Sequence, residues 1–166
     1  YPSDKFLQLV EDVKPDQVTL VPDPPDALTS NAGWDTVKHK AFLREVIAPL
    51  RKMGIRTSLF IDTDLNQVEG AAATETDRIE LYTEDYAKQY KANPEAAIAP
   101  YQKSAHRAQK YNLGINAGHD LNLDNLAYFH KNIPGLLEVS IGHALISDAL
   151  YLGLENTIQL YLRQLK

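Results

Sequence analysis

Cysteine is absent from all 166 residues of the chain. This absence excludes disulfides, thiolate zinc sites and a cysteine nucleophile. No apolar run approaches the roughly 18 residues of a membrane-spanning helix, and no cationic segment followed by an apolar one opens the chain. We therefore expect neither a membrane span nor a secretory signal, and a cytoplasmic location fits best.

The excess of acidic over basic residues is small. The formal net charge is -5, with 44% hydrophobic and 23% charged residues. This balance is typical of a globular domain and argues against disorder. Net negative charge argues against general nucleic-acid binding, although it is compatible with a local pocket for small phosphates. The length suits one domain with its own core.

Segments typical of strands alternate with segments typical of helices. We expect strands over 17–22, 57–62, 78–82, 114–117 and 137–141. We expect helices over 3–13, 35–53, 64–74, 94–111, 123–132, 143–152 and 155–165, and a loop or short helix over 84–91. This alternation predicts a parallel sheet built from right-handed βαβ units.

The predicted strands differ between their two faces. One face is aliphatic and the other is largely polar, with Arg78, Glu80, Glu138 and Ser140 among its members. Strands buried on both sides of a parallel sheet are usually continuous aliphatic runs. The pattern therefore favours a barrel with a polar interior over an open doubly wound sheet. A (β/α)8 TIM barrel has eight strands and about 250 residues, so residues 1–166 would form a single but incomplete barrel domain of about five βα units.

Two side chains on these strands suit acid–base chemistry. His119 follows a glycine at the carboxyl end of a strand, where barrels place catalytic residues, and imidazole titrates near neutral pH. The alternative is that His119 only caps the next helix. Glu80 lies mid-strand on the polar face, where a carboxylate is costly unless it is paired or used, so an internal ion pair is the alternative. We expect Asp62 to cap a helix and Glu138 to be a structural partner.

A phosphate site is predicted at the same edge of the sheet. Gly142 and His143 open a helix whose N–H groups and dipole favour an anion. Barrels often bind phosphate after their last two strands, which are the positions of Gly142–His143 and of 118–120. Thr29 offers a hydroxyl from the long loop over 23–35, although it also reads as an ordinary turn residue. No histidine pair has metal-ligand spacing.

The ordered motifs resemble one family, pyridoxine 5′-phosphate synthase, which closes the ring in vitamin B6 biosynthesis. The motifs are Val21-Pro22 with Thr29 and Gly33-Trp34-Asp35, Ser58-Leu59-Phe60-Ile61-Asp62, Ile79-Glu80-Leu81-Tyr82-Thr83, Asn116-Ala117-Gly118-His119-Asp120-Leu121 and Ile141-Gly142-His143-Ala144. The resemblance implies a cofactor-independent (β/α)8 barrel with extra helices, assembled as an octamer. It also implies condensation of two phosphorylated ketones, 1-deoxy-D-xylulose 5-phosphate and 3-amino-2-oxopropyl phosphate, with release of phosphate and water.

The resemblance also implies roles for individual residues. His119 resembles the proton donor, Glu80 the acidic group that stabilises the transition state, and Thr29 a contact to the deoxyxylulose phosphate. Asp120, Gly142 and His143 resemble the positions that bind the phosphate of the amino-ketone. Some members have glycine at position 120, so we expect Asp120 to bind through its backbone N–H, with its carboxylate pointing elsewhere.

The resemblance places further catalytic residues outside this sequence. The first three strands of the family carry a histidine base, a glutamate base and an arginine-rich phosphate region. The chain opens on Tyr1 rather than Met, at a point that corresponds to just after the third strand. We therefore expect residues 1–166 to represent strands four to eight, and to be inactive alone.

Two other functions fit parts of the pattern. One is a non-catalytic phosphate-binding α/β module, which would have an open sheet and no need for an inward Glu80. The other is a different phosphate-binding barrel, such as an aldolase or isomerase. The absence of lysine at the carboxyl end of any predicted strand argues against Schiff-base chemistry.

Overall fold

The computed structural model describes residues 1–24 and 26–166. Five strands form one parallel sheet in chain order: β1 (Gln17–Leu20), β2 (Arg56–Ile61), β3 (Arg78–Tyr82), β4 (Gly114–Gly118) and β5 (Leu136–Ser140). The helices are α1 (Asp4–Val13), α2 (Lys40–Lys52), α3 (Leu65–Ala72), α4 (Glu84–Tyr90), α5 (Pro94–Lys110), α6 (Leu126–Asn132), α7 (His143–Leu152) and α8 (Leu154–Arg163). The predicted alternation of strands and helices is confirmed.

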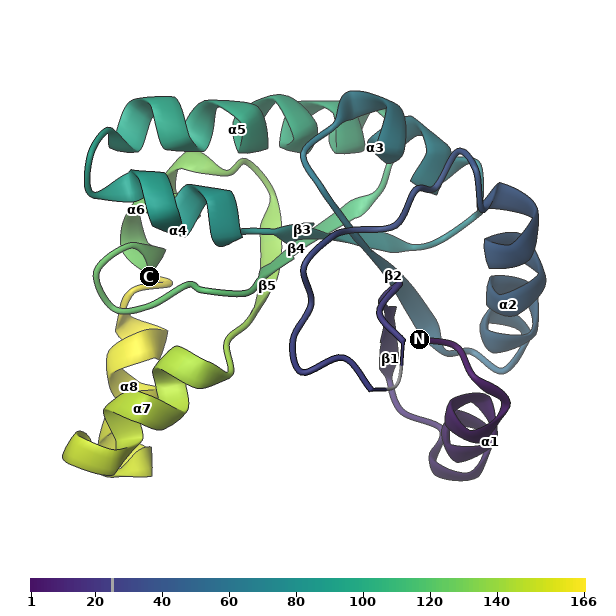
Figure 1. Ribbon diagram of the computed structural model, residues 1–166, viewed down its shortest axis with the longest axis horizontal. Coiled ribbons are helices and arrows are strands. Elements are labelled where there is room, and N and C mark those ends of the chain that lie inside the picture. The colour runs from purple at the N-terminus through teal and green to yellow at the C-terminus, as the bar shows by residue number, and fades with distance from the viewer. Residues whose placement is uncertain (25) are drawn as a thin grey trace.

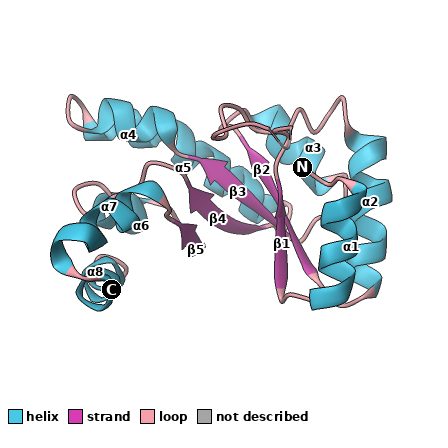
Figure 2. Cartoon of the chain, turned by 60° about the horizontal axis from the view of Figure 1, so that its bottom comes forward, coloured by secondary structure: helices cyan, strands magenta, loops and turns pink. Residues whose placement is uncertain are grey.

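The sheet curls instead of lying open and flat. The middle strands of the sheet run through the centre of the molecule, and β1 and β5 are the two edge strands of the sheet. The helices are arranged around the outside (Figures 1 and 2). An arch of five parallel strands covered by helices on its outer side is part of a barrel wall. The preference for a barrel-like sheet over a doubly wound one is confirmed.

The outer face of the sheet forms the hydrophobic core with the helices. Every second residue of β2 and β3 points to this outer face and is fully buried: Leu59 and Ile61 in β2, Ile79 and Leu81 in β3. The helices pack apolar side chains against this face. In α2 these side chains are Leu43, Ile47 and Leu50. The concave face is left to the polar residues, as the alternation predicted.

The helix after β1 begins later than its sequence pattern predicts. It starts at Lys40 and not at position 35 or 36, and Val37 is 58% exposed. The cause is a tertiary contact, because the Thr36 N–H donates to Oε1 of Gln67 at 2.6 Å and the Thr36 hydroxyl donates to the Gln67 carbonyl at 2.8 Å. Gly70 leaves room for the Thr36 side chain. These bonds hold position 36 against α3 and so delay the helix.

Two further predictions about local structure were wrong. Asp62 does not cap α3: Asp64 accepts the N–H of Asn66 at 2.8 Å, and Asp62 instead accepts the N–H of Gly33 at 3.1 Å. Helix α6 begins at Leu126 and not near 123; residues 123–125 form a turn in which Oδ1 of Asn122 accepts the N–H groups of Asp124 and Asn125.

Charged and amide side chains of the strands form a network across the concave face. Glu138 of β5 accepts hydrogen bonds from Gln17 at 2.9 Å and Asn116 at 3.2 Å. It also forms ion pairs with Arg56 at 3.2 Å and Arg78 at 2.8 Å. These five side chains come from five different strands, so Glu138 is the structural partner that the sequence predicted.

This network makes stability depend on the ionisation of Glu138. Burial alone would raise the pKa of Glu138, but the Gln17 hydrogen bond and the charges of Arg78 and Arg56 outweigh burial and hold that pKa below its ordinary value of 4.5. A carboxyl group with a lowered folded-state pKa stabilises the fold above the unfolded pKa. That contribution disappears as the pH falls through the folded pKa.

We therefore predict that Glu138→Gln lowers the free energy of unfolding at neutral pH, and that its deficit relative to the wild type shrinks as the pH is lowered below 4.5. Urea unfolding of both proteins over a pH series measures this difference. Glu45→Gln removes an exposed carboxylate from the middle of α2 and serves as the control. A deficit that does not change with pH would contradict the role of the charge.

Candidate active site

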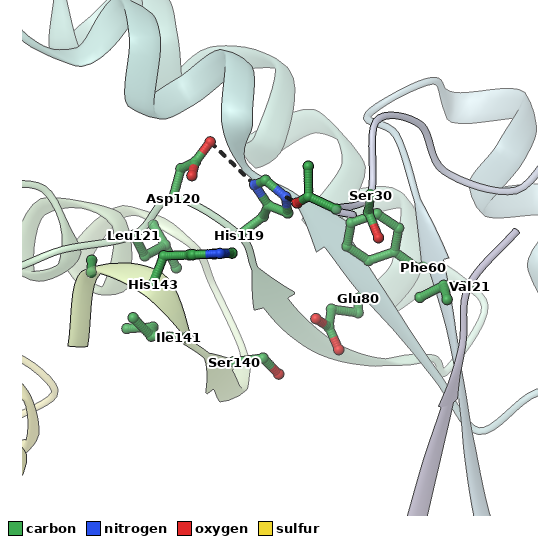
Figure 3. Close-up of a pocket in the computed structure, with 13 residues that line it drawn as sticks. Val21, Ser30, Phe60, Glu80, His119, Asp120, Leu121, Ser140, Ile141 and His143 are labelled. Carbon is green, nitrogen blue, oxygen red and sulfur yellow. Dashed lines mark hydrogen bonds and ion pairs between the residues drawn. The ribbon is translucent and has the colours of Figure 1, made fainter. Parts of the chain in front are cut away.

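A pocket of about 520 Å³ lies at the carboxyl ends of the strands, on the concave side of the sheet (Figure 3). The six residues that the sequence analysis selected all line it: Thr29, Glu80, His119, Asp120, Gly142 and His143. They come from the loop after β1, from β3, from the turn after β4 and from the start of α7. The structure therefore brings together every predicted site residue.

Glu80 points from β3 into this pocket (Figure 3) and is only 6% exposed. Its Oε2 accepts a hydrogen bond from the Thr19 hydroxyl at 3.1 Å. Gly118 on the neighbouring strand leaves the space that the carboxyl group occupies, since a Cβ atom there would collide with Oε1. Within the described part of the chain Glu80 forms no ion pair, so the internal ion pair is not its role.

Burial raises the pKa of Glu80 above its ordinary value of 4.5. The hydroxyls of Thr19 and Ser140 act in the opposite direction, because they stabilise the charged form, and the nearby charge of Glu138 raises the pKa further. Desolvation dominates. The group therefore holds its proton more tightly than an exposed glutamate, which is a property of catalytic carboxyl groups.

The turn after β4 has an unusual backbone. His119 has φ of 80° and Asp120 has φ of 52°, both in the left-handed region that residues with a Cβ atom seldom adopt. The Thr83 hydroxyl donates to the carbonyl oxygen of Gly118 at 2.8 Å and also to that of His119. The Asn125 side chain donates to the Asp120 carbonyl at 3.3 Å. Strain that is held in place in this way is characteristic of functional sites.

The imidazole of His119 is fixed on several sides. Its Nε2 lies 2.9 Å from the Thr29 hydroxyl, and its Nδ1 lies 3.1 Å from Oδ2 of Asp120. The ring also stacks edge to face on Tyr82, with centroids 4.8 Å apart. His119 caps no helix, so that alternative reading of the residue is wrong, and its ring borders the pocket.

The loop that carries Thr29 is anchored to the sheet. The Tyr82 hydroxyl donates to the carbonyl oxygen of Ser30 at 3.1 Å, and burial raises the pKa of Tyr82, which keeps the phenol protonated. The Ser30 hydroxyl donates to Asp23 at 2.6 Å. Gly33 packs directly on the backbone of Ile61, where no Cβ atom fits. These contacts hold Thr29 over His119.

The first turn of α7 supplies backbone donors to the pocket. Gly142 immediately precedes the helix and His143 is its first residue. A helix of 10 residues presents unpaired N–H groups and a partial positive charge at this end. This end of the pocket can therefore hold a phosphate group.

The pocket also contains residues that the sequence analysis did not select. Ser140, which ends β5, lines the pocket beside Glu80. Thr19, one residue before the end of β1, does not line the pocket but donates a hydrogen bond to Glu80. Both lie on the concave face, so the two-residue period of a strand was a signal that could have identified them. Ser30 and Val21 come from a loop without periodicity, and only the folded structure places them here.

Residues 1–24 and 26–166 contain no group of three or more histidine, aspartate or glutamate side chains arranged to hold a metal ion.

Across the same residues, no helix is both long enough and apolar enough to cross a membrane.

Comparison with known proteins identifies close relatives. The family described as pyridoxal phosphate biosynthesis protein PdxJ matches residues 1–166. A protein of Cytophaga hutchinsonii named pyridoxine 5′-phosphate synthase is 62% identical over 99% of this chain and 69% of its own length. Proteins of the same name from Flavobacterium johnsoniae and Porphyromonas gingivalis are 59% and 57% identical, again over 99% of this chain, and over 70% and 69% of their own lengths.

The raised pKa of Glu80 predicts a stability effect opposite to that of Glu138. A group whose folded-state pKa is raised stabilises the fold below its unfolded value of 4.5, and that contribution is lost as the pH rises through the folded pKa. We predict that Glu80→Gln gains stability relative to the wild type as the pH is raised from 4 to 8, in urea unfolding experiments. A gap that is constant over this range would contradict the desolvation of Glu80.

Proposed function

Because the chain belongs to the family of the pyridoxal phosphate biosynthesis protein PdxJ, we propose that it is a pyridoxine 5′-phosphate synthase. The reaction joins 1-deoxy-D-xylulose 5-phosphate to 3-amino-2-oxopropyl phosphate and yields pyridoxine 5′-phosphate, phosphate and water. The supporting observation is that all six residues with expected roles line one pocket. No cofactor is required in this proposal.

Each end of the pocket has its own part in the proposed chemistry. Gly142 and His143 hold the phosphate of the amino-ketone through the amino end of α7, together with the backbone of Asp120. Thr29 contacts the deoxyxylulose phosphate. These contacts fix both substrates beside the acid–base groups, which turns a reaction between two molecules into one within a single complex.

The acid–base groups then act on the bound substrates. Condensation of an amine with a ketone and closure of the ring expel hydroxyl groups as water, and each such step needs a proton. His119 supplies it as a general acid. Glu80 faces the same space and stabilises positive charge that develops on the nitrogen-containing intermediate, an interaction that is strong because the carboxyl group is desolvated.

The proposal extends to the assembly. We place these five βα units in a (β/α)8 TIM barrel, with the remaining bases on the other strands, in a cytoplasmic octamer. The eight-strand count and the octamer rest on the family resemblance. The curl of the sheet supports the barrel, and so do the unpaired outer sides of β1 and β5 within the described residues, since a closed barrel leaves no exposed strand edges.

A non-catalytic phosphate-binding module is the weaker alternative. Such a module would need phosphate donors but no buried carboxylate. Burying Glu80 without a charged partner is unfavourable, and the left-handed backbone of His119 is strained. Binding alone explains neither cost, whereas acid–base catalysis explains both.

We predict that His119→Ala in the complete enzyme lowers the rate of pyridoxine 5′-phosphate formation by about 10²–10⁴-fold, the usual contribution of a general acid. Phosphate affinity should change far less, because the phosphate contacts come from other residues. Product chromatography and calorimetric titration with inorganic phosphate measure the two quantities. His106→Ala, on the exposed face of α5, is the matched control. Equal losses in rate and affinity would remove the acid role from His119.

A further inference from the structure

The carboxylate of Asp120 lies against the ring of His119, on the side away from Glu80 (Figure 3). Its Oδ2 is 3.1 Å from Nδ1, within the distance of an ion pair, although the two atoms do not meet the geometry of a hydrogen bond. Nδ1 is buried and has no other polar partner among the described residues. The family resemblance implies that this carboxylate points away from the phosphate, and in the structure it faces the imidazole.

The other ring nitrogen of His119 is in a different environment. Nε2 lies 2.9 Å from the Thr29 hydroxyl, which also lines the pocket. One nitrogen therefore meets a carboxylate that can only accept a hydrogen bond, and the other meets a hydroxyl that can donate or accept. This asymmetry sets which nitrogen carries the proton of the neutral ring.

We infer that Asp120 is a positioning residue that keeps a proton on Nδ1 of His119, and thereby leaves Nε2 as the atom that exchanges a proton with substrate. In the neutral ring Nε2 accepts a hydrogen bond from Thr29. When Nε2 takes up a proton, both nitrogens carry hydrogen, and the Nε2–H group faces the pocket as the donor. Asp120 acts only through the ring. The inference rests on the proposed function, because it names the donor atom of that site.

The backbone conformation of the turn places the Asp120 side chain beside the His119 ring. Asp120 is held at φ of 52°, with its carbonyl oxygen bonded to Asn125, so its carboxylate starts from a fixed place beside the ring. Glycine and asparagine accept this left-handed conformation with little strain, whereas alanine does not. Asp120→Gly and Asp120→Asn therefore remove the side chain or its charge without changing the turn.

Nitrogen NMR of the complete enzyme labelled at histidine tests the contact directly. The signals of His119 are assigned by their loss in His119→Gln, and spectra are recorded at alkaline pH, where imidazoles are neutral. We expect the wild type to show the Nδ1–H tautomer. Asp120→Gly should lose this preference, and Asp120→Asn should keep part of it through its amide oxygen. Asp124→Asn makes the same charge change on a side chain that is 72% exposed and serves as the control.

Kinetics complete the test. Asp120→Gly should lower kcat about tenfold, a fraction of what a general acid contributes, with KM changed less than about twofold. An unchanged tautomer in Asp120→Gly overturns the inference even in a fully active enzyme, and so does a changed tautomer with unaltered kcat. Absence of product from the wild-type enzyme overturns the proposed function instead, and the activity assay alone reveals it.

Discussion

The burial of one carboxyl group, that of Glu80, constrains the residues around it on the concave face of the sheet. Among the described residues it has no ion-pair partner, and its desolvation cost is offset by the hydroxyls of Thr19 on β1 and Ser140 on β5. Its side chain also needs the space that Gly118 leaves on β4. Three strands therefore carry small or hydroxylic side chains around Glu80, so that one acid can face the pocket. Such a site reduces stability in exchange for reactivity, as active sites commonly do.

Two glutamates on the same face show how the environment separates structure from chemistry. Glu138 lies between Arg56 and Arg78, and these charges lower its pKa and keep it ionised as the tie between strands. Glu80 lies one layer closer to the carboxyl ends, forms no ion pair with any arginine of the described residues, and has its pKa raised by burial. Carboxyl groups whose environments move their pKa values in opposite directions commonly have different roles in one protein. Here Glu138 links the strands of the sheet, and Glu80 is available to a substrate.

Much of this arrangement could be predicted from the sequence, because it depends on local periodicity. Alternation along β2 and β3 predicted the two faces, and a glycine followed by His119 predicted a functional strand end. The failures arise from contacts between distant segments. The bonds between Thr36 and Gln67, 31 residues apart, delay α2. The approach of Asp120 to the ring depends on two successive left-handed residues that are not glycine, and no sequence rule specifies such a turn.

A crystal structure of the complete enzyme with pyridoxine 5′-phosphate is the most direct test of whether this pocket forms that product. We expect the product phosphate on the N–H groups of Gly142 and His143. We expect the pyridine ring between the Glu80 carboxyl group and Nε2 of His119. Product bound elsewhere, or a ring that contacts neither Glu80 nor His119, would show that the pocket does not form it.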